Sequence, residues 1–496
     1  MERPKLPRSA AARATRPLAA CLALGLAPGL GACGDEATPP ARVTVQVLLP
    51  DGLNPLAGNA RLVFTFHKSD VDTFVETLAA DGGTSGDLTF TYSFPEEMET
   101  SVLEVTAEDS GNNVRARGRS VPFDIVKGRV LTVGVLVLSL DQWSYAPAAM
   151  RLSVARALHG AAVVGDGGLL VAGGTTAGGV TTTVEVFDLN AWEAVPGVPD
   201  MPVPRSRFAM VALNADQTLL LGGVMASSTA DMFDGPTQTW SQIPLPLDLP
   251  DIWKGPRVID MDNASAMFLG GFDGSDAAVP LLVRGTGTEI TTVADTLDRA
   301  DPSVTPVRTA DGLRFLLYGG NELGTMAAAL LDPATGAVEE DFESPDESRT
   351  RSSAALVGND KVIVLGGFGT DGTTLETHAR ILDLGCTEGP PACSRWADGG
   401  TVLSAGGFVD AVGVPIDAEN GDTRAIFIGG VDASENPTDT VLVDADYPVA
   451  IRKPMRTPRS AAAVVRLPTG QIAVIGGLDA AGNPLDTIEL YEPQAR

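Results

Sequence analysis

A pair of adjacent glycines recurs along the last two thirds of this 496-residue sequence. The first pair is Gly173-Gly174, and six more follow at steps of 49, 48, 49, 47, 63 and 47 residues. The later pairs are Gly222-Gly223, Gly270-Gly271, Gly319-Gly320, Gly366-Gly367, Gly429-Gly430 and Gly476-Gly477. A period near 48 residues, broken once, is typical of a chain built from stacked repeats.

Each repeat contains several short segments of strand length. In the first repeat they include the small-residue segment Gly160–Val164, the segment that ends at the glycine pair, and Val184–Phe187. Four short strands in a unit of this length are typical of a propeller blade, whereas helical repeats need longer apolar periodicities. We therefore expect an all-β fold in which residues 141–496 form a seven-bladed β-propeller.

These repeats resemble kelch repeats. The resemblance rests on the glycine pair, on third strands that end in an apolar residue and an aspartate, as in Phe187-Asp188, and on the tryptophan that opens the fourth strand, as in Trp192 and Trp240. It covers roughly residues 141–496 and implies a seven-bladed kelch-type propeller. The copper-radical oxidases of the kelch group need a histidine pair, tyrosines and a cysteine cross-linked to a tyrosine. With His159 and His378 alone in the repeats, five tyrosines and no spare cysteine, we do not expect that activity here.

The last repeat lacks a fourth strand within this sequence, because the chain ends just after the third. Gln142-Trp143-Ser144, ahead of the first repeat, resembles the fourth-strand segment Thr239-Trp240-Ser241. We expect the segment 141–148 to complete the last blade, since an open strand edge invites aggregation.

The first 32 residues have the pattern of a signal peptide. Five basic residues precede an apolar run from Pro17 to Leu30, which is too short to span a bilayer. The run ends in Leu30-Gly31-Ala32-Cys33, which resembles a bacterial lipobox and implies cleavage before Cys33 and attachment of lipid to its thiol. An ordinary signal peptide with a chance cysteine is the alternative. Because Gly34 rather than aspartate follows the cysteine, we favour the outer membrane over the inner one.

Between the lipobox and the repeats, the sequence predicts a tether and a small β domain. Residues 33–41 contain Pro39-Pro40 and are expected to be an extended tether. From residue 42, apolar and polar residues alternate, and further strand candidates separated by turn residues follow at 61–66, 87–94, 101–108, 114–119 and 130–140. The last of these is apolar throughout, so we expect it to be a single strand buried on both faces. We expect 42–140 to be a β-sandwich of immunoglobulin-like or transthyretin-like kind that serves as a spacer.

Two cysteines remain for a local disulfide. Cys386 and Cys393 bracket a short loop with two prolines, in the repeat whose step is lengthened to 63 residues. In an exported protein this spacing favours a disulfide bond that holds an oversized loop. A metal site is the alternative, but no histidine lies near either cysteine.

Charge and motifs limit the possible functions. The formal net charge of -28 argues against nucleic acid as a partner and against broad contact with anionic membranes. The sequence contains no cluster with metal-ligand spacing, no nucleophile elbow and no glycine-rich phosphate loop. We therefore assign no catalytic, metal or cofactor residues, and we expect a monomer that contacts the membrane through its lipid alone.

An arginine recurs just before the innermost strand of most repeats. The set is Arg156, Arg207, Arg257, Arg308, Arg351 and Arg459. One interpretation is an arginine-lined mouth that binds an anionic group such as a carboxylate, a sulfate or an acidic sugar. The other is that these arginines are part of the repeat and pair with backbone groups or neighbouring carboxylates.

The function expected from the sequence is a non-catalytic platform on the cell envelope that binds a protein or a glycan. The alternative is an envelope enzyme acting on an acidic sugar, similar to the kelch epimerases of sialic acid, whose sites do not form a linear motif. The sequence leaves both open.

Overall fold

The computed structural model describes residues 39–494, except 69–70, 80–87, 95–96, 225–228, 245–256, 262–264, 270–280, 285–288, 293–301, 310–311, 320–327, 343–348, 370, 372, 387–395, 402–407, 418–420 and 448–449. The predicted signal peptide and Cys33 lie outside the described residues. Residues 40–496 form one compact unit. The prediction of an all-β fold is confirmed. Within the described ranges, no helix is long and apolar enough to cross a membrane.

Residues 41–140 form two sheets that share one hydrophobic core. In the first, β1 (Ala41–Leu48) lies between the antiparallel β4 (Leu88–Phe94) and the parallel β8 (Val130–Leu136). The second has the order β3-β2-β5-β6-β9, with β7 also paired to β5. Its strands are β2 (Arg61–Lys68), β3 (Val71–Ala79), β5 (Met98–Glu108), β6 (Val114–Arg119), β7 (Phe123–Ile125) and β9 (Leu138–Ser139). Buried side chains from both sheets, among them Val45, Phe64 and Val105, form the core between them.

The segment 130–140, expected from its apolar sequence to be one strand buried on both faces, is two strands. β8 belongs to the first sheet and β9 to the second, so the chain crosses between sheets near Val137. Val130 is 71% exposed, whereas Val133 to Leu138 are buried. The apolar run therefore covers two packing surfaces in succession.

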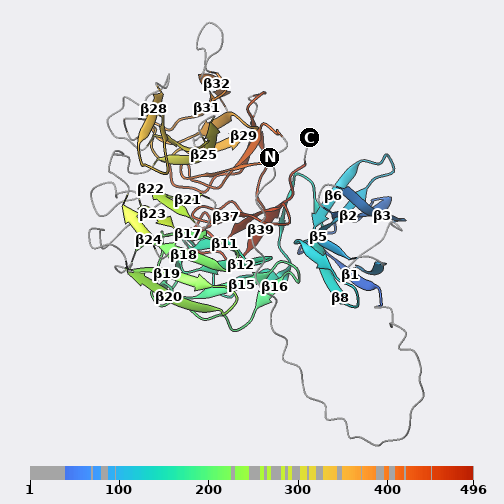
Figure 1. The fold of residues 1–496 in the computed structure, drawn as a ribbon. Helices are drawn as coiled ribbons and strands as arrows, with labels where there is room; N and C mark the ends of the chain where they lie inside the picture. The colour runs from blue at the N-terminus through green and yellow to red at the C-terminus, as the bar shows by residue number, and fades with distance from the viewer. Residues whose placement is uncertain are drawn as a thin grey trace, which may run out of the picture. The chain divides into compact units, whose positions relative to one another are not determined.

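The rest of the described chain forms seven four-stranded antiparallel sheets, numbered here in chain order (Figure 1). Sheet 1 is β11 (Gly160–Val164), β12 (Gly168–Ala172), β15 (Val184–Asp188) and β16 (Glu193–Val195). Sheet 2 is β17 (Ala209–Ala212), β18 (Gln217–Leu221), β19 (Thr229–Asp234) and β20 (Thr239–Pro244). Sheet 3 is β21 (Arg257–Asp260), β22 (Ala266–Leu269), β23 (Leu281–Arg284) and β24 (Glu289–Thr292). Sheet 4 is β25 (Ser303–Thr309), β26 (Gly312–Tyr318), β27 (Ala328–Leu331) and β28 (Val338–Phe342).

The remaining three sheets have the same plan. Sheet 5 is β29 (Ser353–Val357), β30 (Lys361–Leu365), β31 (His378–Asp383) and β32 (Trp396–Thr401). Sheet 6 is β33 (Val412–Pro415), β34 (Arg424–Ile428), β35 (Val441–Asp444) and β36 (Ile451–Arg452). Sheet 7 is β37 (Ala463–Arg466), β38 (Ile472–Ile475), β39 (Ile488–Tyr491) and β10 (Trp143–Tyr145). A small hairpin, β13 (Thr175–Thr176) with β14 (Gly179–Val180), and the 3-10 turn η1 (Ala148–Met150) stand outside the seven sheets.

Sequence composition explains which strands lie deepest. The second strands are continuously apolar, as in Leu169–Ala172 of β12 and Ile472–Ile475 of β38, and these residues are buried. The first strands alternate between buried and half-buried residues, as in β11 and β29. A strand covered on both faces needs a continuous apolar run, whereas one with a more open face alternates.

Seven hydrophobic clusters lie between neighbouring sheets, and together they connect the seven sheets in a closed cycle. Six of them join sheets 1 and 2, 2 and 3, 3 and 4, 4 and 5, 5 and 6, and 6 and 7. The seventh joins sheet 7 to sheet 1 through side chains such as Ile475, Leu490, Leu169 and Phe187. The first strands β11 and β37 also contact each other, so the green and red ends of the series are neighbours in Figure 1. This arrangement fits a β-propeller.

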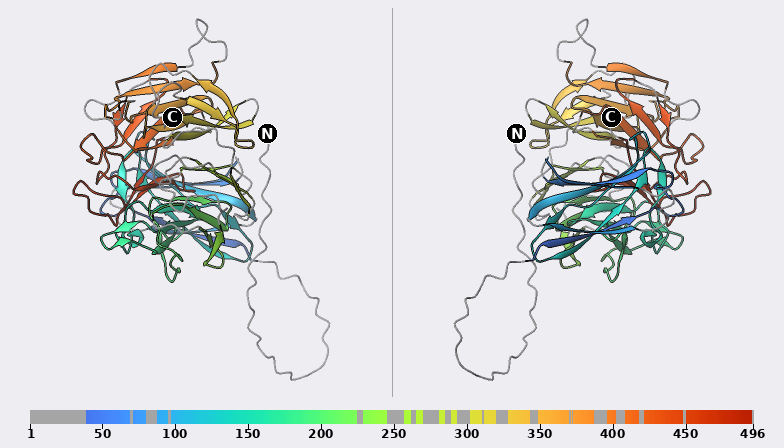
Figure 2. Two further views of the ribbon diagram at one scale, coloured as in Figure 1. Left: turned by 90° about the vertical axis from the view of Figure 1, so that its left-hand side faces the viewer. Right: turned by 90° about the vertical axis from the view of Figure 1, so that its right-hand side faces the viewer.

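The chain closes the cycle with a strand from before the first sheet. β10 is the fourth strand of sheet 7, in which Trp143 lies opposite Tyr491 and Tyr145 opposite Glu489. The Trp143 indole donates to the Thr440 hydroxyl at 3.0 Å and to the Lys453 carbonyl at 2.9 Å, both in the sheet 6 repeat. Figure 2 shows the strands of residues 41–140, in blue to cyan, and the seven sheets, in green to red, from two further sides.

The recurring glycine pair marks the contact between one sheet and the next. Gly173 and Gly174 have φ values of 61° and 96°, and the other described glycines of the pairs also have positive φ. A Cβ on Gly173 would lie 2.6 Å from the Arg205 carbonyl oxygen of sheet 2, and one on Gly174 would lie 2.6 Å from that of Ala157. Glycine is required here because the backbone is left-handed and no space remains for a side chain.

Candidate functional site

Four buried arginines repeat through the sheets at a fixed distance from the glycine pair. In sheets 1, 2, 5 and 7 the guanidinium Nη1 donates to the carbonyl of the first glycine of the pair, seventeen residues later. These arginines are Arg156, Arg205, Arg349 and Arg459, and at most 1% of each is exposed. The left-handed glycines turn their carbonyls out of the strand ladder, and the guanidinium satisfies them.

A second carbonyl and a carboxylate complete each arginine site. In sheet 2, Arg205 donates to Gly222 at 3.0 Å, to the Thr229 carbonyl at 2.7 Å and to Asp231 at 2.8 Å. In sheet 1, Arg156 pairs in the same way with the Thr183 carbonyl and with Glu185. A buried cation is tolerated only when it is paired and hydrogen-bonded, and these contacts meet both conditions.

Burial shapes the titration of these pairs. Burial lowers the pKa of Arg156, and the charge of Glu185 opposes that effect. Burial likewise lowers the pKa of Arg459 and raises that of its partner Glu489, whose carboxylate also accepts the backbone N–H groups of Arg456 and Thr457. Both charges of the pair are held inside the protein, so these two groups are structural.

Two residues after each buried arginine, the backbone enters the left-handed region again. The described positions are Leu158, Arg207, Arg351 and Ala461, together with Asp410 at the matching position of sheet 6, with φ between 52° and 60°. We call these five the ring residues. Backbone hydrogen bonds link ring residues of adjacent sheets. The Leu158 N–H donates to the Ala461 carbonyl at 2.9 Å, and the Arg207 N–H donates to the Leu158 carbonyl at 3.0 Å. The Asp410 N–H donates to the Arg351 carbonyl at 3.1 Å. The ring therefore runs through sheets 7, 1 and 2 and through sheets 5 and 6.

All five ring residues line one cavity of about 690 Å³, which we call the ring cavity. Its wall also contains Phe208, Phe368, His159 and Leu478, from sheets 1, 2, 5 and 7. Aromatic and aliphatic groups thus stand beside six charged residues, which are Arg207, Arg351, the buried Arg459, Asp410, Asp432 and Glu435. This combination is usual for a ligand pocket.

The two ring arginines differ in their partners. Arg351 donates to both carboxylate oxygens of Asp410, with Nε distances of 3.1 and 3.0 Å, and its guanidinium lies 5.7 Å from the centre of the Phe368 ring. Arg207 is exposed, and among the described residues no carboxylate pairs with it. One cation of the ring is neutralised, and the other is available.

His159 is a buried polar group in the cavity wall. It is 8% exposed, and neither ring nitrogen has a hydrogen-bond partner among the described residues. Burial lowers the pKa of the imidazole to about 3, and the nearby charge of Arg156 acts in the same direction. His159 is therefore neutral at physiological pH.

The exposed aspartates in the loops after the second strands are engaged in turns. Asp432 accepts the backbone N–H groups of Ser434 at 2.8 Å and Asn436 at 3.0 Å, and Asp479 makes the same pair of bonds with Ala481 and Asn483. These N–H groups lower the pKa of both carboxyls. No three His, Cys, Asp or Glu side chains within the described ranges are placed to hold a metal ion.

The structure separates the six arginines singled out from the sequence. Arg156 and Arg459 are buried against carbonyls and carboxylates, and Arg207 and Arg351 belong to the ring. Arg308 lies near the far end of β25 rather than before it, so it is not a ring residue. Arg257 begins β21, and its side chain lies outside the described part of the structure. The expectation of six equivalent arginines is wrong, since they occupy different positions of the repeat.

Sequence reasoning missed Arg205 and Arg349. Both stand in Arg-X-Arg segments, and the second arginine of each segment was assigned to the repeat instead of the first. The missed signal is the spacing of seventeen residues to the glycine pair, which Arg156, Arg205, Arg349 and Arg459 share.

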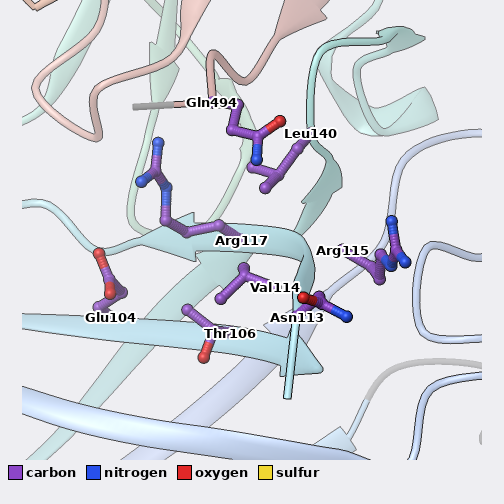
Figure 3. Close-up of a pocket in the computed structure, with 8 residues that line it drawn as sticks. All are labelled: Glu104, Thr106, Asn113, Val114, Arg115, Arg117, Leu140 and Gln494. Carbon is purple, nitrogen blue, oxygen red and sulfur yellow. The ribbon is translucent and has the colours of Figure 1, made fainter. Parts of the chain in front are cut away.

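A second cavity, of about 480 Å³, lies between β5, β6 and the last described residues (Figure 3). Arg115 and Arg117 of β6 line it together with Glu104, Thr106, Leu140 and Gln494. Its arginines are already paired: Arg115 with Asp109 and Arg117 with Glu492. Cys386 is buried, and its predicted disulfide partner Cys393 lies outside the described residues, so that bond stays a prediction.

Comparison with known proteins adds little to these observations. No protein-family model matches the chain. No curated protein matches it either. The solved structure titled "Structure of YjhT" is similar to this one with 14% sequence identity and a TM-score of 0.42, over 68% of this chain and 96% of that one.

Proposed function

We propose that this protein is an exported lipoprotein, held on the cell envelope through Cys33, that binds a protein or a glycan without catalysis. In this proposal residues 42–140 are a β-sandwich and residues 141–496 a seven-bladed kelch-like propeller. The seven sheets in cyclic order, the core between sheets 7 and 1, and the pairing of β10 with β39 support the propeller. The two sheets around one core support the sandwich.

The ring cavity carries the binding proposal. Arg207 presents a guanidinium that pairs with no carboxylate of the described residues, at a cavity with Phe208 and Phe368 in its wall. In a chain with a formal net charge of -28, such a cation is conspicuous. A guanidinium beside apolar surface favours a partner that offers a carboxylate or a sulfate next to an apolar group or a sugar ring.

The ring backbone does not compete for such an anion. The N–H groups of Leu158, Arg207 and Asp410 donate to the carbonyls of neighbouring sheets, so they are not free donors. Recognition then depends on side chains, chiefly on Arg207. This makes the proposal testable with one substitution.

The charges in the cavity favour binding over catalysis. A general acid or base works best with a pKa near the operating pH, and burial lowers the pKa of His159 to about 3. Asp410 is held by Arg351, and Asp432 accepts backbone N–H groups of its own loop.

The alternative, an enzyme that epimerises or mutarotates an acidic sugar, rests on the two unpartnered nitrogens of His159 at the cavity wall. NMR of an acidic sugar incubated with the protein distinguishes the two functions. Binding alone does not accelerate exchange between anomers or between epimers, whereas a mutarotase accelerates the first and an epimerase the second.

An array of acidic glycans and acidic peptides tests the binding proposal. We expect Arg207→Met to lose retention of the ligands that the wild-type protein binds, with an unchanged unfolding midpoint. Arg452→Met is the matched control, because Arg452 is an exposed arginine of the outermost strand of sheet 6. Equal retention by the wild type and Arg207→Met would refute a role for the ring cavity.

Lipid attachment is tested separately. Cys33→Ser should abolish incorporation of labelled palmitate and move the protein from the detergent phase to the aqueous phase. Separation of the two membranes of cells expressing the wild-type protein then tests the preference for the outer membrane. Incorporation of label in Cys33→Ser would contradict the lipobox assignment.

A further inference from the structure

The cycle of sheets is closed by one short strand. β10 pairs with β39 at three positions, Trp143, Ser144 and Tyr145. The outermost strands of the other sheets range from two residues in β36 and three in β16 to six in β20 and β32, so β10 is at the short end of this range. A strand this short contributes few hydrogen bonds. The junction of β10 with β39, which we call the seam, therefore needs support from other contacts.

An arginine from the N-terminal sheets supplies part of that support. Arg117 of β6 donates from Nε to the Glu492 carboxylate at 2.7 Å and from Nη2 to the Pro493 carbonyl at 2.6 Å. The Glu492 side chain is 1% exposed and that of Arg117 14%. Figure 3 shows Arg117 extending from β6 on the side of Leu140 and Gln494, while Arg115 lies across the pocket.

Residues 491–494 are also held by the segment that leads into β10. Leu140 bridges to Glu492, and the Asp141 N–H donates to the Glu492 carbonyl at 2.8 Å. The Asp141 carboxylate accepts the Tyr491 hydroxyl at 2.9 Å and the Gln494 N–H at 3.0 Å. Glu492 is therefore fixed from two directions, by Asp141 and by Arg117.

The contact continues into the core between sheets 7 and 1. Leu136 and Leu138, from the N-terminal sheets, belong to the same hydrophobic cluster as Ile488 and Leu490 of β39. The Gln471 amide, just before β38, donates to the Leu136 carbonyl at 3.0 Å, and both residues are buried. Polar and apolar contacts thus join residues 41–140 to the two sheets that meet at the seam.

We propose that residues 41–140 stabilise the closed cycle of seven sheets through one contact, which we call the clasp. In this contact Arg117 holds the end of β39 against β10, so these two strands separate only when Arg117 is released from Glu492 and Pro493. Without the guanidinium, the buried Glu492 carboxylate loses its cation, and an uncompensated buried charge is strongly destabilising. The effect should be local, since proteins open in contiguous units of different stability. The proposal does not depend on what the ring cavity binds.

Hydrogen exchange of the full chain, resolved by peptide, tests the clasp. Arg117→Met should speed exchange of the amides in β10 and β39 by about tenfold or more. A tenfold change corresponds to about 1.4 kcal/mol, and breaking a buried ion pair costs more than this. Exchange in β18 and β19 of sheet 2 should not change. Arg115→Met is the control, since Arg115 lies two residues away in β6 and pairs with the half-buried Asp109 at an exposed site.

Two results would overturn the clasp. One is unchanged exchange of β10 and β39 in Arg117→Met; the other is an equal increase in sheets 2 and 7, which would mean general destabilisation. If Arg117→Met does not fold, Arg117→Lys replaces it. Lysine keeps the charge but cannot hold Glu492 and Pro493 with one rigid fork, so a smaller increase confined to the same strands is expected, and none would refute the proposal.

Discussion

The pair Arg205 and Arg207 offers a direct test of the repeat arginine, because the same residue type occupies a buried and an exposed position two residues apart. Arg205→Met removes bonds to Asp231, Gly222 and Thr229 and keeps an unbranched side chain of similar length. Asp231 is fully buried, and among the described residues its carboxylate would retain only the Gln242 amide, at 3.2 Å. Breaking a buried pair in this way costs about 3–5 kcal/mol.

The exposed neighbour sets the baseline. Arg207→Met changes no described ion pair, so its effect on the free energy of unfolding should stay within about 0.5 kcal/mol. Urea unfolding followed by tryptophan fluorescence measures both variants, and the midpoints are compared at equal m-values. Adding Asp231→Asn to Arg205→Met should recover part of the loss, since the uncompensated charge is removed.

The opposite pattern would refute this reasoning. If Arg205→Met unfolds within about 1 kcal/mol of the wild type, the buried arginine does not organise the repeat. If Arg207→Met loses as much stability as Arg205→Met, the ring arginine is structural and the binding proposal loses its main support.

Three further predictions follow from the backbone, the seam and the buried histidine. Gly367→Ala should destabilise more than Gly482→Ala in urea melts: both glycines have positive φ, but a Cβ on Gly367 would lie 2.7 Å from the Thr350 oxygen and one on Gly482 would meet nothing within 4 Å. Deleting 141–148 should abolish cooperative unfolding, since sheet 7 loses β10, and an unchanged melt would refute this role. The folded-state pKa of His159 is lowered to about 3, so the protein should lose about 1.4 kcal/mol per pH unit from this group as pH falls from 6.5 towards 3; His159→Gln should remove this slope, and parallel stability curves would contradict it.

Much of the local structure is encoded in short-range patterns. The period of the glycine pairs and the short apolar segments indicated an all-β chain, because these features depend on near neighbours along the chain. The segments 61–66 and 114–119 proposed as strands correspond to β2 and β6. Left-handed backbone at the pairs could be anticipated as well, since glycine alone adopts it without strain.

Pairing between segments far apart in the chain has no such local sequence pattern. The parallel pairing of β1 with β8 joins segments about 80 residues apart, and an alternating pattern is the same for parallel and antiparallel neighbours. The crossing near Val137 was likewise hidden, because an apolar run does not tell which of two sheets covers each part.

The arginines show most clearly what each level determines. The sequence alone indicates that an arginine precedes most first strands. The spacing of seventeen residues from this arginine to the glycine pair is also present in the sequence, but in the two Arg-X-Arg segments it does not stand out, because two arginines are candidates. Tertiary structure decided which arginine is buried: Arg205 reaches the carbonyls that the left-handed glycines turn out of the ladder, and Arg207 is left at the ring cavity. The physical reason is that a buried guanidinium needs several acceptors at fixed positions, and only the folded sheets bring those acceptors together.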